Sequence, residues 1–198
     1  MTLFRTPLLV VDTETTGFLS NPHAQPWEIG AVLLDRDGVE VATFSAVGCP
    51  LVLEPDMQGA LDIGGVTLTY LRDQSPMSEV AWHFQDWIDG QDPQAMWTAF
   101  NVAFDRQMLE RVGLRGSRWA PCIMEKVKPI MGEAGHLPWY NKYHDYKMPR
   151  LSEAAAFFEV PQQEPAHRAL ADARTAGLIA AALVRRMRRV PRCECEEG

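Results

Sequence analysis

Long hydrophobic runs are absent from this 198-residue sequence. The longest apolar run near the start, residues 7–11, stops at Asp12. It is far shorter than the roughly 20 residues of a membrane-spanning helix, and it is also too short for the core of a secretory signal. We therefore expect a protein without membrane contact that stays in the cytoplasm.

Cysteine is scarce, with four residues in the chain. Cys49 and Cys122 stand alone among apolar neighbours, where a reduced thiol behaves as a small hydrophobic group. Cys193 and Cys195 lie near the C-terminus, but a zinc site needs about four ligands and no second cysteine or histidine pair lies nearby. We expect a flexible tail over residues 191–198, with a metal site in the tail as the weaker alternative.

An excess of positive charge is also lacking. The chain has 19 basic and 26 acidic residues and a formal net charge of −7. Because non-specific binding of nucleic acid comes from Lys and Arg that neutralise phosphates, this balance argues against a broad grip on a long duplex. It remains compatible with a small site that holds only the end of a strand.

The pattern of apolar residues predicts a mixed α/β fold in one domain over residues 1–190. Asp37-Gly38 is a hairpin signal between two expected strands, and Thr67, Ser78 and Ser152 are expected N-caps of helices. We expect a central mixed five-stranded sheet flanked by helices. Its strands are expected over 8–13, 27–35, 39–47, 95–100 and 119–124, and its helices over 67–71, 78–88, 104–112, 152–158 and 169–189.

The stretch 132–149 is expected to be a long irregular loop in which aromatic and basic residues alternate. Such interleaving is typical of surfaces that hold single-stranded nucleic acid. The simpler interpretation is a loop that its aromatic residues pin to the core. The aromatic residues are Trp139, Tyr140, Tyr143 and Tyr146, and the basic ones are Lys142, His144 and Lys147.

Three segments carry carboxylates at positions that otherwise face the core. Asp12 and Glu14 lie in VVDTETTG, and alternate residues of a strand share one face. Asp105 in NVAFDRQML shares a helical row with Met108, Leu109 and Val112, and Asp172 in HRALADA shares one with Ala176, Ile179 and Leu183. A buried anion is costly unless it holds a metal or an ion pair.

A histidine accompanies these acids. His167 precedes Asp172 by five residues, which on one helix would place them about 140° apart. For both to face one site, His167 must lie on the loop before the helix, where it is free to approach and leave a water molecule. A neutral imidazole, with an ordinary pKa of about 6.5, can accept a proton from that water near neutral pH.

The residue types indicate the metal. Carboxylate oxygens select hard cations such as Mg²⁺ or Mn²⁺, and two such ions can activate a water and stabilise the leaving oxygen of a phosphodiester. Without cations, two carboxylates 4 Å apart repel by about 4 kcal/mol at an effective dielectric constant near 20. The alternative is ordinary ion pairing, of Asp105 with Arg106 or Arg111 and of Asp172 with Arg168 or Arg174.

Over residues 8–184 the three segments resemble the three motifs of the DEDDh family of 3′–5′ exonucleases. This DnaQ-like family includes ribonuclease T, exonuclease X and the epsilon subunit of polymerase III. The resemblance implies a ribonuclease H-like fold, two Mg²⁺ or Mn²⁺ ions and His167 as the general base. It implies as metal ligands Asp12, Glu14, Asp105 and Asp172. It places near the 3′-terminal nucleotide Thr15, Thr16, Gly17 and Phe18. We also count Asn101 and Phe104 as substrate-binding residues, and we expect them to support the site through packing and orientation.

The function that this resemblance implies is removal of nucleoside 5′-monophosphates from the 3′ end of single-stranded DNA or RNA. A non-catalytic nucleic-acid interaction module of the same fold is one alternative. An RNA-processing exoribonuclease or an endonuclease is another. A homodimer and association with a polymerase are both compatible with the sequence.

Overall fold

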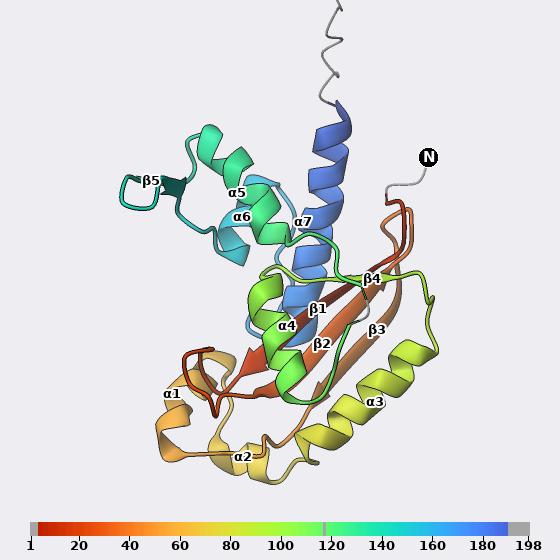
Figure 1. Cartoon of the computed structure of the whole chain (residues 1–198), viewed down its shortest axis with the longest axis vertical. Coiled ribbons are helices and arrows are strands. Elements are labelled where there is room, and N and C mark those ends of the chain that lie inside the picture. Colours follow the sequence, from red (N-terminus) through yellow and green to blue (C-terminus); the bar gives the residue numbers. More distant parts are fainter. Residues whose placement is uncertain (1–3, 117, 190–198) are drawn as a thin grey trace, which may run out of the picture.

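The chain folds into a mixed β-sheet with helices on both faces (Figure 1). The computed structural model describes residues 4–116 and 118–189, so the expected tail with Cys193 and Cys195 lies outside the described residues. In chain order the elements are β1 (Leu8–Thr15), β2 (Pro26–Leu34), β3 (Glu40–Val47), a 3-10 helix (Pro55–Met57), α1 (Gln58–Leu61), a second 3-10 helix (Asp62–Gly64), α2 (Leu68–Arg72), α3 (Met77–Asp89), β4 (Met96–Thr98), α4 (Val102–Arg111), α5 (Ile123–Glu133), β5 (Trp139–Tyr140), β6 (Asp145–Tyr146), α6 (Leu151–Phe157) and α7 (Ala169–Arg189).

The strand order of the main sheet is β3-β2-β1-β4. β1 is antiparallel to β2, with Asp12 opposite Gly30, and parallel to β4. β4 is short and pairs with β1 only as far as Val10. Among the described residues, therefore, no strand pairs with this edge of β1 beyond Val10, and the edge is open where the two acids of β1 lie.

The prediction of a fifth strand in the main sheet is wrong. Within the described residues the main sheet has four strands, and Trp119 makes only an isolated bridge to Trp97. The Ala120 N–H donates to the Trp97 carbonyl at 2.7 Å, but Pro121 has no N–H to continue the ladder. The chain then turns into α5 at Ile123 instead of extending the sheet.

Of the three residues predicted to be N-caps of helices, one is confirmed and two are wrong. Thr67 is an N-cap, because its hydroxyl accepts the Tyr70 N–H at 3.1 Å. Ser78 is not: α3 begins one residue earlier, where the Met77 N–H donates to the Cys49 carbonyl at 2.8 Å. Ser152 is also not a cap. α6 begins at Leu151, and the Glu153 carboxylate accepts the N–H of the preceding Arg150 at 2.8 Å.

The stretch 132–149 is more regular than expected. Its first residues complete α5, and β5 and β6 then form a two-stranded antiparallel hairpin. The expected Asp37-Gly38 turn between β2 and β3 is confirmed, with Gly38 at a φ of 79°, a conformation that glycine adopts easily. The long last helix is also confirmed as α7.

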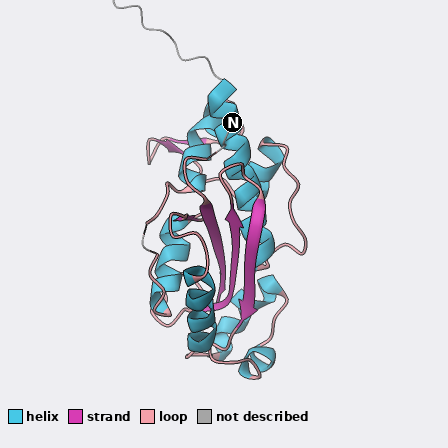
Figure 2. Ribbon diagram, turned by 90° about the vertical axis from the view of Figure 1, so that its right-hand side faces the viewer, coloured by secondary structure: helices cyan, strands magenta, loops and turns pink. Residues whose placement is uncertain are grey.

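Helices cover both faces of the main sheet, as Figure 2 shows. α7 packs on the face that carries Val10, while α3 and α4 pack on the face that carries Val11. The first turn of α7 approaches β2 so closely that a Cβ on Gly30 would overlap the backbone of Ala169. Glycine at this position thus lets the start of α7 sit beside the acids of β1.

No helix in the described ranges is long and apolar enough to cross a membrane.

Candidate active site

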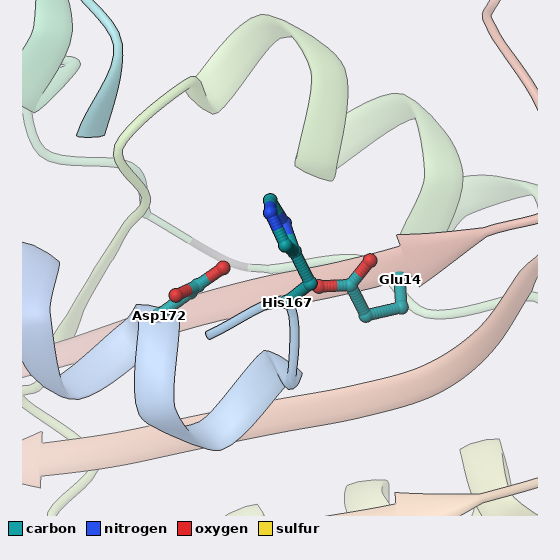
Figure 3. Close-up of side chains that lie close together, drawn as sticks. All are labelled: Glu14, His167 and Asp172. Atoms are coloured by element: carbon teal, nitrogen blue, oxygen red, sulfur yellow. The ribbon is translucent and has the colours of Figure 1, made fainter. Parts of the chain in front are cut away.

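Four of the five predicted site residues lie on two elements, β1 and α7, and on the loop that precedes α7. Asp12 and Glu14 project from β1 toward α7, Asp172 lies in the first turn of α7, and His167 lies on the preceding loop as expected. Figure 3 shows three of these side chains at the start of α7. One ligand atom from each of Glu14, His167 and Asp172 lies within 4.8 Å of the other two.

Asp105, in the first turn of α4, reaches the same region from the open edge of β1. Its Oδ1 accepts hydrogen bonds from the Thr13 N–H at 3.0 Å and from the Thr13 hydroxyl at 2.9 Å. The carboxylate thereby accepts the Thr13 N–H, which has no partner in a neighbouring strand because β4 pairs with β1 only as far as Val10. Its charge contributes to raising the pKa of Asp12, so the two acids are close neighbours.

The site gathers negative charge in a poorly hydrated place. Burial raises the pKa of Asp12 well above its ordinary value, and the charges of Asp105, Glu14 and Asp172 add to this. Burial also raises the pKa of Glu14 to about 7, and that of Asp105 to about 7 despite the opposing hydrogen bonds from Thr13. The pKa of Asp172 is raised by burial and lowered in part by His167.

The ion-pair interpretation of Asp105 and Asp172 is wrong, because all four arginines proposed as their partners are bound to other groups. Arg106 pairs with Glu110, and Arg111 donates to the backbone carbonyls of Leu19, Asn21 and Ala24. On α7 and the loop before it, Arg174 pairs with Glu40 and Arg168 with Glu28.

The residues fit a divalent metal site. Oδ1 of Asp172 is buried and has no hydrogen-bond partner among the described residues. Such an atom is costly unless a cation or a proton satisfies it. Together with the neighbouring carboxylates, it provides the hard oxygen donors that Mg²⁺ and Mn²⁺ prefer. Divalent cations would also offset the mutual repulsion that raises the pKa of Asp12.

One residue of this region was not predicted as functional. Glu28 on β2 is only 1% exposed and binds Arg168 through two contacts, both 2.9 Å, with a third from the Ala169 N–H at 3.3 Å. Arg168 directly follows His167, which has a positive φ of 59°. The Glu28–Arg168 pair therefore anchors the loop that carries the histidine. The signal was available, since Glu28 is a charged residue within an entirely buried strand.

We expect Arg168→Met to lower kcat about 10- to 100-fold and to change the pH dependence of kcat, because His167 would lose its fixed position. Arg174→Met is the matched control: it removes another arginine–glutamate pair of the same geometry from α7. The control should retain activity within about twofold. Equal rates and pH profiles for Arg168→Met and the wild-type protein would show that the pair does not position the histidine.

Five of the six predicted substrate-binding residues line one pocket of about 470 Å³ beside Glu14. They are Thr15, Thr16, Gly17, Phe18 and Phe104. The opposite wall comes from the region of α1 and includes Met57 and Ile63. Asn101 is not among the lining residues. It precedes α4, and its carbonyl accepts the N–H groups of Phe104 and Asp105, so it helps to position the acid.

Comparisons with known proteins agree with this architecture. A family model described as Exonuclease, of the RNase T type, matches residues 9–180. The structure of cell-death related nuclease 4 (CRN-4) matches with a TM-score of 0.69 and 13% identity, over 94% of this chain and 66% of that one. A search of curated proteins gave no match.

Exonuclease I structures also match. The zinc-bound complex of the E. coli enzyme with single-stranded DNA gives a TM-score of 0.70 and 16% identity, over 93% of this chain and 41% of that one. The enzyme from Methylocaldum szegediense gives 0.67 and 16%, over the same two shares. This chain thus spans less than half of exonuclease I. These matches confirm the ribonuclease H-like α/β fold, and the family model, which covers most of the sequence, shows that the chain belongs to the exonuclease family.

Proposed function

We propose that this protein is a metal-dependent 3′–5′ exonuclease that releases nucleoside 5′-monophosphates from single-stranded DNA or RNA. The observation that carries the proposal is the convergence of four carboxylates and one histidine beside a pocket of nucleotide size. Family membership supports the reaction type. The structural match to exonuclease I, whose complex with single-stranded DNA is known, supports the substrate class.

The four acids would hold the metal, with Asp12, Glu14 and Asp172 on the α7 side and Asp105 at the open edge of β1. When bound, two Mg²⁺ or Mn²⁺ ions supply Lewis acidity that activates water and balances the charge on the reacting phosphate. His167 is exposed on its loop and accepts a proton from the attacking water. A ligand atom of Asp172 lies within 4.8 Å of one of its ring nitrogens, so the histidine stands directly beside the carboxylates that would hold the metal.

The pocket beside Glu14 would receive the 3′-terminal nucleotide. Phe18 and Ile63, both largely exposed, offer apolar surfaces on which a base can stack. Glu14 lines this pocket and also belongs to the group that can hold a metal. A nucleotide bound there would therefore place its 5′ phosphate next to the carboxylates. A 3′–5′ exonuclease cleaves the bond between this phosphate and the preceding nucleotide.

The test is product analysis with single-stranded DNA and RNA 20-mers labelled at the 5′ end, in Mg²⁺ or Mn²⁺ and with excess chelator. We expect a ladder that shortens from the 3′ end, nucleoside 5′-monophosphates as products, and no reaction with chelator. A circular single strand should stay intact. Cleavage of the circle would indicate an endonuclease, and the absence of any metal-dependent product would indicate a non-catalytic module.

A further inference from the structure

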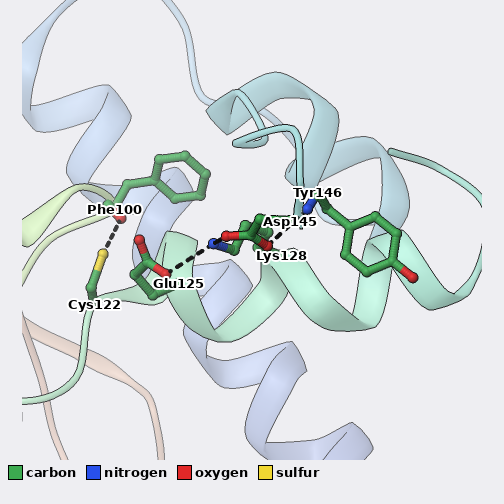
Figure 4. Close-up of polar contacts among 6 residues, drawn as sticks. All are labelled: Phe100, Cys122, Glu125, Lys128, Asp145 and Tyr146. Carbon is green, nitrogen blue, oxygen red and sulfur yellow. Dashed lines mark hydrogen bonds and ion pairs between the residues drawn. The ribbon is translucent and has the colours of Figure 1, made fainter. Parts of the chain in front are cut away.

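The β5–β6 hairpin is attached firmly to α5 by its second strand. The Asp145 carboxylate accepts a hydrogen bond from the Lys128 ammonium group at 2.6 Å, as Figure 4 shows. The Tyr146 ring packs against the helix at Gly132, where a Cβ would overlap the ring. Glycine inside α5 is thus explained by the close approach of this ring. Two adjacent residues of β6 thus fasten the hairpin to α5.

The remaining aromatic residues of the hairpin are not needed for this attachment and face outward. Trp139 is 50% exposed, Tyr140 44% and Tyr143 67%. The ammonium group of Lys142 lies 5.2 Å from the centre of the Tyr143 ring. Trp139 meets Tyr146 edge to face, with 4.9 Å between the ring centres, which holds the indole in place while half of it stays exposed. A group of exposed aromatic rings on a fixed support is typical of an interaction site.

The chemistry of this surface fits single-stranded nucleic acid. Aromatic rings stack on bases of any sequence, and neighbouring cations neutralise the backbone phosphates. Here the Lys142 ammonium group lies over the exposed Tyr143 ring, so a cation and an aromatic surface are offered together although the net charge of the chain is −7. An acidic partner with planar apolar faces matches both properties.

α5 connects the hairpin to the end of the sheet at which the site lies. α5 starts beside the end of β4, where the Ile123 and Met124 N–H groups donate to the carbonyls of Ala99 and Phe100. Its 11 residues correspond to about 16 Å, or about five stacked nucleotides at 3.4 Å each. In Figure 1 the hairpin and the C-terminal end of β1 lie on the same side of the molecule.

We propose that the outer face of the β5–β6 hairpin, formed by Trp139, Tyr140, Lys142 and Tyr143, binds the single strand several nucleotides to the 5′ side of the reacting end. This inference rests on the proposed function, because the bound strand is the substrate. It predicts that long substrates bind more tightly than short ones, because only a long strand can contact the hairpin while its 3′ end is in the active site.

The test compares the double variant Trp139→Ala/Tyr143→Ala with Trp82→Ala, which removes an even more exposed tryptophan from α3. For a single-stranded DNA 20-mer we expect KM of the double variant to rise about 10- to 100-fold, since stacking contributes about 1–3 kcal/mol per base. With a dinucleotide, kcat/KM should change less than about twofold. Trp82→Ala should match the wild-type protein on both substrates.

Binding of the fluorescent 20-mer by anisotropy, in chelator, separates this inference from the proposed activity. A loss of affinity in the double variant supports the hairpin site even if the wild-type protein cleaves nothing. Unchanged affinity and KM for the 20-mer would overturn it. So would an equal loss of kcat/KM on the 20-mer and the dinucleotide, because that result would indicate a change at the active site.

Discussion

Asp172→Asn is expected to lower the rate of 3′-terminal hydrolysis at least about 1,000-fold, which corresponds to about 4 kcal/mol of transition-state stabilisation. Asparagine has nearly the same shape as aspartate, but it removes the negative charge at a buried carboxylate oxygen that has no hydrogen-bond partner within residues 4–116 and 118–189. The variant should bind the metal much more weakly and should remain folded. Single-turnover rates over a range of Mn²⁺ concentrations measure both effects.

Asp86→Asn is the matched control for this change. Asp86 is an exposed aspartate on α3, so the same chemical substitution there leaves the site untouched. We expect the control to cleave at the wild-type rate. If Asp172→Asn kept more than about a tenth of the wild-type rate at saturating metal, Asp172 would not be a ligand required for the reaction.

The convergence of the acids could be predicted because each is an exception to a local pattern. Asp105 and Asp172 interrupt rows that face the core, and the structure places Asp105 among buried residues and Asp172 in the first turn of α7. The same reasoning applied to β2 would have found Glu28, which lies in a strand with no exposed residue. Its significance was missed because its partner Arg168 lies 140 residues away in the sequence.

Other features depend on contacts that no local pattern encodes. α5 contains Pro129, which a sequence-based interpretation treats as a helix breaker, yet the helix continues to Glu133. The apolar pattern of residues 119–124 predicts a strand, but the segment makes only one bridge to the sheet, because Pro121 lacks the N–H that would extend the ladder and the chain then enters α5. The hairpin of β5 and β6 is held to α5 by Asp145 and Tyr146, so its regularity comes from tertiary contacts.

Helix starts show the same limit in a simpler form. Thr67 caps its helix through its own hydroxyl, which is a local interaction that the sequence reveals. α3 instead begins where the Met77 N–H meets the carbonyl of Cys49, a residue far away in the chain. A serine one position inside the helix is then not required as a cap. Local chemistry predicts a boundary only where no distant group satisfies the same donors.

The metal-free protein is expected to lose stability as the pH rises from about 5 to 8. The pKa values of Glu14 and Asp105 are raised to about 7 in the folded state, whereas the unfolded chain releases these protons near pH 4. Between these values the folded state binds more protons, so the free energy of unfolding must fall with rising pH. Each group contributes about 2.5 kcal/mol over this range, so we expect a total loss of about 5 kcal/mol, measured by urea unfolding in chelator.

Mg²⁺ at about 100 times its Kd should restore about 2.7 kcal/mol at pH 8, because it binds only the folded site. Asp105→Asn isolates the contribution of one acid. Its amide oxygen can keep both hydrogen bonds from Thr13, but the variant has no charge to accumulate as the pH rises. The metal-free variant should therefore be more stable than the wild-type protein at pH 8 and similar to it at pH 5. The wild-type protein and the variant could instead lose the same stability between pH 5 and pH 8. In that case the pH dependence would come from groups other than Asp105, and the burial of this acid would not create the need for a cation.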